Sequence, residues 1–70
     1  MRQKTEIEKE AHRVASHLCS MRGANSTADK TVVRALLLST GGSLFFAGVL
    51  HNIKTEHLGA DVYKVWMVPV

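Results

Sequence analysis

Four histidines and one cysteine are the side chains of this chain best suited to holding a metal ion. His12 and His17 are five residues apart, so on a helix they point about 140° apart around the axis. His51 and His57 stand near the ends of a segment that we expect to be a loop, and Cys19 has no second cysteine beside it. A zinc site needs three or four converging ligands at defined spacings, which this pattern does not supply. The sequence therefore predicts no metal ion and no cofactor.

Nucleophilic catalysis would depend on Cys19, the one thiol, with a histidine as its base. A lone cysteine within a helix is more often a small buried hydrophobic residue. Residues 39–43 have the small side chains of an anion-binding loop, but they lack a lysine and follow a predicted helix rather than precede one. We therefore expect no catalytic residues and predict that the protein is not an enzyme.

The composition indicates one small folded domain that covers residues 1–70. The chain has 46% hydrophobic and 21% charged residues, which is typical of a folded protein and not of a disordered one. Its single cysteine excludes an internal disulfide framework. A domain this short buries only about 60% of the surface of its unfolded chain, so we expect oligomerisation to complete its core.

Apolar residues recur at intervals of four and three in the N-terminal part, which predicts an amphipathic helix over residues 5–22. The members of this seam are Ile7, Ala11, Val14, Leu18 and Met21. Thr5 followed by Glu8 predicts a capping box at the start of the helix, and Gly23 predicts its end.

A second helix is predicted over residues 28–40, with Ser26 or Thr27 as its cap and Gly41-Gly42 as its end. Its apolar residues lie almost all round the axis, which is typical of a helix buried on several sides or placed in an interface. Residue types that favour strands follow over residues 44–53 and 62–68, with a polar loop between them. Pro69 belongs at a strand end, because it cannot donate to a ladder of hydrogen bonds.

The fold class predicted from this order is α+β, with two N-terminal helices packed on a C-terminal two-stranded antiparallel hairpin, in the order α-α-β-β. In the last strand Tyr63, Val65 and Met67 alternate with Lys64 and its neighbours, so both faces carry apolar side chains. Two short helices cover one face, which leaves the other for a partner or a second copy. The predicted association surface comprises Ile7, Val14, Leu18, Met21, Phe45 and Trp66.

Nucleic acid is the alternative partner, because the formal net charge is +3. Phosphate contacts would come from Lys30, Arg34, Lys54 and Lys64. A helix followed by a hairpin is similar, in the order of elements only, to winged-helix modules. The alternative function is therefore a dimeric DNA-binding transcriptional regulator that uses a helix-plus-hairpin surface.

A membrane span is the second alternative, since residues 32–50 carry Arg34 as their only charge. The uncharged part is only sixteen residues long and has a polar centre at residues 39–43, whereas a span needs about 20 apolar residues. A helix followed by a strand explains the same residues better.

The function predicted first is a small non-enzymatic protein-binding regulator or inhibitor that docks on a larger protein or complex. We expect it to be cytoplasmic and to form a homo-oligomer. Its size and composition suit a bacteriophage or mobile-element accessory protein.

Overall fold

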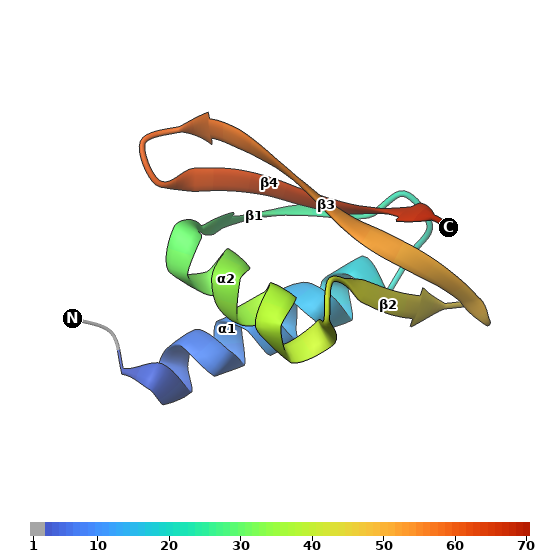
Figure 1. The fold of residues 1–70 in the computed structure, drawn as a ribbon, viewed down its shortest axis with the longest axis horizontal. Helices are drawn as coiled ribbons and strands as arrows, with labels where there is room; N and C mark the ends of the chain where they lie inside the picture. Colours follow the sequence, from blue (N-terminus) through green and yellow to red (C-terminus); the bar gives the residue numbers. More distant parts are fainter. Residues whose placement is uncertain (1–2) are drawn as a thin grey trace.

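The computed structural model describes residues 3–70 and contains two helices and four strands (Figure 1). In chain order the elements are α1 (Lys4–Leu18), β1 (Asn25–Asp29), α2 (Lys30–Thr40), β2 (Ser43–Phe46), β3 (Val49–Gly59) and β4 (Val62–Pro69). All neighbouring strands are antiparallel, in the sheet order β1-β4-β3-β2. The α+β class is confirmed.

The finer prediction of an α-α-β-β order with a two-stranded hairpin is wrong, because the sheet has four strands and the helices are interleaved with them. Residues 25–29 form edge strand β1 and pair with β4 over their whole length, although the sequence predicts no strand there and assigns residues 28 and 29 to the second helix. The strand expected over residues 44–53 is divided into β2 and β3 by a turn at Ala47-Gly48. The expected loop at residues 55–60 instead belongs almost wholly to β3, which continues to Gly59.

Helix α1 presents its apolar seam to the interior. Ala11, Val14 and Leu18 are buried, and Ile7 packs against them at the margin of the core. The helix begins after Gln3, without a side-chain cap, so the capping box predicted at Thr5 is wrong. It ends at Leu18, four residues before the predicted end, because the chain turns there to reach β1.

Helix α2 has well-defined ends. The Asp29 carboxylate accepts a hydrogen bond from the Val32 backbone N–H at 2.9 Å, so Asp29, and not Ser26 or Thr27, is the N-cap. Gly41 ends the helix in the left-handed conformation, with φ 70°, as the sequence predicts. Between these ends Val32, Val33 and Leu36 are buried.

Both helices lie on one side of the sheet (Figure 1). Directly opposed residues of antiparallel strands point to the same face, so the register assigns each side chain to a face. Val65 of β4 is completely buried, and Tyr63, Met67 and Ile53 pack beside it against the helices. The predicted alternation of β4 is therefore confirmed.

The residues of the predicted membrane span, 32–50, are distributed over α2, β2 and the start of β3. Among the described residues, no helix has the length and the hydropathy that crossing a membrane requires.

The C-terminal end of α1 makes a side-chain bond to each edge strand of the sheet. His17 Nε2 donates to the Asn25 carbonyl of β1 at 3.0 Å. The Cys19 thiol lies 3.6 Å from the Phe45 carbonyl of β2 and donates to it. One helix end thus contacts both outer strands, β1 and β2.

Both residues of the turn between β2 and β3 have a positive φ, 53° at Ala47 and 78° at Gly48. Two positive φ values define the type I′ turn, for which Asn-Gly is the preferred sequence. Ala47→Asn should raise the free energy of unfolding by about 0.5–1 kcal/mol, since asparagine tolerates the left-handed region better than alanine. Ala47→Val, with a branched Cβ, should lower it by about 1–2 kcal/mol. Urea unfolding of the two variants measures both changes, and equal stabilities would contradict this account of the turn.

Candidate functional site

The candidate site is the face of the sheet that the helices leave uncovered, here called the outer face. On β4 it carries Lys64, Trp66 and Val68, which alternate with the core residues Tyr63, Val65 and Met67. The register places these further side chains on the same face: Asn25 and Thr27 of β1, Asn52, Lys54 and Glu56 of β3, and Ser43 and Phe45 of β2.

Trp66 lies at the centre of the outer face. Asn25 of β1 and Lys54 of β3 are its direct cross-strand partners. The Lys64 ammonium stands 5.6 Å from the centroid of the indole ring, within the range of a cation–π contact. The ring is half-buried by these neighbours and keeps part of its surface open. The centre of the outer face is therefore an aromatic surface bordered by two lysines, with the carboxylate of Glu56 on β3 across from Lys64.

An apolar row crosses one end of the outer face. Phe45 opposes Leu50, and the Val70 N–H donates to the Leu50 carbonyl at 3.0 Å, so the row is Phe45, Leu50 and Val70. Phe45 is 70% exposed, and Leu50 and Val70 are exposed too. Val68 joins this row to Trp66, so apolar surface continues along β4 from the row to the centre of the face. Exposed apolar side chains gathered in one patch are typical of an interaction surface.

The six residues of the predicted association surface do not form one surface. Val14 and Leu18 are buried in the core, where they contact α2 and the sheet, so a partner cannot reach them. The heptad seam serves the fold of this chain itself. Phe45 and Trp66 lie on the outer face, whereas Met21 is exposed in the turn after α1 and Ile7 lies at the margin of the core.

The four residues predicted to contact phosphates are likewise divided. Lys54 and Lys64 lie on the outer face, Lys54 across from Trp66 on β3 and Lys64 two residues before it on β4. Lys30 and Arg34 are exposed on α2, which covers the opposite face of the sheet. A single helix-plus-hairpin surface made of all four residues is therefore wrong, because the sheet separates the two pairs.

Three of the four histidines, His17, His51 and His57, and also Cys19, are each engaged locally. His57 Nε2 donates to the Ala60 carbonyl at 2.6 Å, and its ring stacks on Tyr63 at a centroid distance of 4.8 Å. His51 Nδ1 donates to the Val49 carbonyl at 2.8 Å. Across residues 3–70, no group of three histidine, cysteine or acidic side chains is placed to hold a metal ion.

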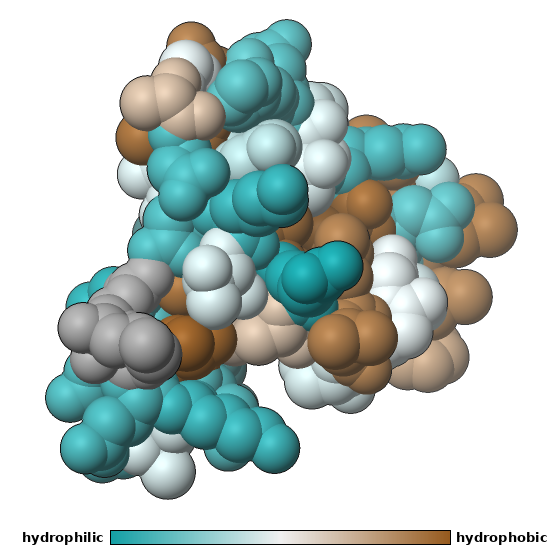
Figure 2. All heavy atoms as spheres, turned by 60° about the vertical axis from the view of Figure 1, so that its left-hand side comes forward, coloured by the Kyte–Doolittle hydropathy of each residue, from teal (hydrophilic) through white to brown (hydrophobic). Residues whose placement is uncertain are grey.

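A second apolar surface lies between the two helices, here called the helix groove. It has a volume of about 750 Å³, and its small residues are Ala11, Ala15 and Ala35. Leu38 stands at its side and is 80% exposed, and Lys4 and Glu8 also line it. Figure 2 shows that apolar side chains gather in one part of the surface and that hydrophilic ones cover much of the rest.

The sequence prediction leaves out four exposed or half-buried apolar residues of these surfaces: Leu38, Leu50, Val68 and Val70. The signal for Leu38 was present, because α2 is apolar almost all round and cannot bury every side. Leu50 and Val70 gave no separate signal, since their alignment with Phe45 depends on the turn at Ala47-Gly48.

Trp66 is the one tryptophan of the chain, so its fluorescence reports on the outer face. Because Lys54 and Lys64 border the ring, iodide should quench the fluorescence more strongly than caesium does. Lys54→Gln with Lys64→Gln should remove the difference, and Lys30→Gln with Arg34→Gln should leave it intact. Stern–Volmer titrations at constant ionic strength measure this. Resistance to both ions would contradict an uncovered outer face.

Comparison with known proteins identifies no relative: no protein-family model, curated protein or solved structure matches the chain. Function is therefore inferred from the geometry of the described residues.

Proposed function

We propose that this chain is a non-enzymatic protein-binding regulator that docks on a larger protein through the outer face of its sheet. The observation that carries the proposal is the one-sided packing of the helices, which leaves Trp66, Val68, Phe45 and Leu50 at the surface. A half-buried tryptophan next to an apolar patch with a polar rim is typical of the residues that dominate binding energy in protein interfaces.

The chemistry of the outer face indicates what the partner presents. Phe45, Leu50 and Val70 need an apolar surface, and Lys54 and Lys64 favour carboxylates beside it. We therefore expect an apolar patch bordered by aspartate or glutamate on the larger protein.

Self-association uses a different surface in this proposal, the helix groove. Leu38 projects beside a hollow whose small residues, such as Ala35, leave room for a large side chain. A twofold axis close to Leu38 allows each copy to insert this side chain into the groove of the other, as an isologous interface requires. Lys4 and Glu8, both in the groove, supply opposite charges that such an axis can pair across the interface. The outer faces of both copies then stay available to the larger protein.

The docking proposal predicts that a charge at Val68, between Trp66 and the apolar row, removes binding. Val68→Lys should weaken capture of the larger protein by about thirtyfold or more, the effect of losing about 2 kcal/mol at an interface hot spot. Leu58→Lys is the matched control, since Leu58 is exposed beyond the outer-face patch, near the turn between β3 and β4. Tagged wild-type and variant proteins are compared by quantitative mass spectrometry of co-purified proteins, with circular dichroism to confirm folding. A partner retained by Val68→Lys, or lost equally with Leu58→Lys, would contradict the proposal.

The self-association proposal predicts that Leu38→Glu converts a dimer into a monomer, because a carboxylate cannot enter the apolar groove unpaired. Light scattering over a concentration series measures the mass, with Leu58→Glu as the control that stays dimeric. A wild-type monomer at all concentrations, or a dimeric Leu38→Glu variant, would show that the helix groove is not the dimer interface.

Single-stranded nucleic acid is the second candidate partner, favoured by the two lysines beside Trp66. Bases stack on exposed aromatic rings while lysines contact phosphates. With two such contacts, affinity for a 15-nucleotide strand should fall about sevenfold between 50 and 200 mM salt. Fluorescence anisotropy measures this. Binding that has this salt dependence and is lost in a Lys54→Gln and Lys64→Gln variant would show that the partner is nucleic acid and not a protein. Absence of binding would exclude single-stranded nucleic acid as the partner.

A further inference from the structure

A hollow of about 500 Å³ lies between the end of α1 and the hairpin of β2 and β3, away from both the outer face and the helix groove. Its apolar walls come from Leu18, Ala24, Phe46, Val49, Met67 and Pro69. The volume lies within the range of small-molecule sites, about 300–1,000 Å³, which are mostly apolar with a few placed polar groups. Met67 adds an adaptable thioether to the wall.

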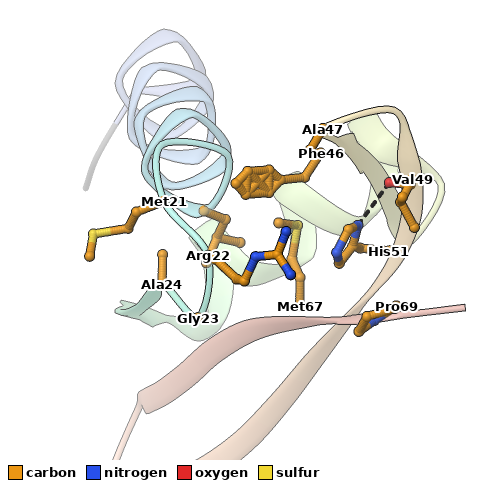
Figure 3. A pocket seen from close by; sticks show the side chains of 11 residues that line it. Met21, Arg22, Gly23, Ala24, Phe46, Ala47, Val49, His51, Met67 and Pro69 are labelled. Carbon is orange, nitrogen blue, oxygen red and sulfur yellow. Dashed lines mark hydrogen bonds between the residues drawn. The ribbon is translucent and has the colours of Figure 1, made fainter.

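Arg22 supplies the charge of this hollow. Figure 3 shows its side chain extending into the space toward Met67 and the ring of His51, while Met21 points away. No aspartate or glutamate is among the described residues that line the hollow. Within residues 3–70, Arg22 makes no hydrogen bond or ion pair. Arg22 is exposed, and an exposed guanidinium beside apolar walls, without a carboxylate partner, can bind an anion from outside the chain.

His51 is the second polar side chain of the hollow, and its orientation is fixed. Its Nδ1–H donates to the Val49 carbonyl at 2.8 Å, and its ring packs against Phe46 at a centroid distance of 5.8 Å. Because Nδ1 is engaged, Nε2 is the nitrogen left for a ligand. Phe46 and His51 thus form a ring-lined wall opposite Arg22 (Figure 3).

We propose that this hollow binds a small amphipathic organic anion, with an apolar body against Phe46 and Met67 and a carboxylate or sulfonate head at Arg22. The guanidinium donates two hydrogen bonds to the head group, and the walls bury the apolar body. The helix groove is larger, but it carries both Lys4 and Glu8 and so has no preference for anions. This site is separate from the protein-binding surfaces proposed above and does not depend on them.

Two fluorescent probes with the same ring system test the proposal. The first is 8-anilino-1-naphthalenesulfonate, and the second is N-phenyl-1-naphthylamine, which lacks the sulfonate. Arg22→Gln should weaken binding of the sulfonate about tenfold and change that of the neutral probe less than twofold. Arg13→Gln is the matched control, an exposed arginine of α1 that does not line the hollow. Phe46→Ala should weaken the binding of both probes, because it removes an aromatic part of the wall.

The position of the bound sulfonate is measured separately by NMR. Signals of Met67 and His51 should shift on titration, while those of Ile7 and Leu38 in the helix groove should not. Sulfonate affinity within twofold of wild type in Arg22→Gln, or equal losses in Arg22→Gln and Arg13→Gln, would overturn the proposal. Shifts confined to Ile7 and Leu38 would overturn it as well, since the probe would then occupy the helix groove.

Discussion

The burial of Val65 against the two helices is the contact on which the rest of the structure depends. Val65 lies on β4, which pairs with β1 on one side and β3 on the other. Its side chain is completely buried, as are those of Leu18, Val32 and Leu36, one or two from each helix. Each such side chain contributes about 1.5–3 kcal/mol when it leaves water. Because both helices pack into this one core on the same side of the sheet, neither is available to cover the other face.

The sequence predicts well those elements whose signals are local. The end of α2 at Gly41, the alternation of side chains on β4 and the uncovered second face all follow from residue types at short range. Strand β1 could not be predicted in this way, since Asn25–Asp29 is polar and becomes a strand by pairing with β4, far away in the sequence. The division of residues 44–53 was missed because Ala47 is not a usual turn residue at positive φ.

The residues of the candidate surfaces, too, can be predicted from the sequence only where the signal is local. Phe45 and Trp66 were found because large apolar residues on strands are visible in the sequence, and both lie on the outer face. The seam predicts that Val14 and Leu18 contact a partner, because an apolar seam does not reveal whether its contact belongs to the same chain. Lys30 and Arg34 were grouped with Lys54 and Lys64 because charge alone carries no information on which side of a sheet a residue lies.

The bonds from the end of α1 to the two outer strands limit how another chain can attach. β1 and β2 have five and four residues, and His17 and Cys19 take up the carbonyls of Asn25 and Phe45 on those edges. An incoming strand would have to displace both side chains before it could extend the sheet, and it would find only a short template on either side. Edge-to-edge growth into fibres is thereby disfavoured, although both faces of the sheet are rich in apolar residues. Recognition is left to the broad faces of the molecule, where side chains and not main-chain hydrogen bonds determine what binds.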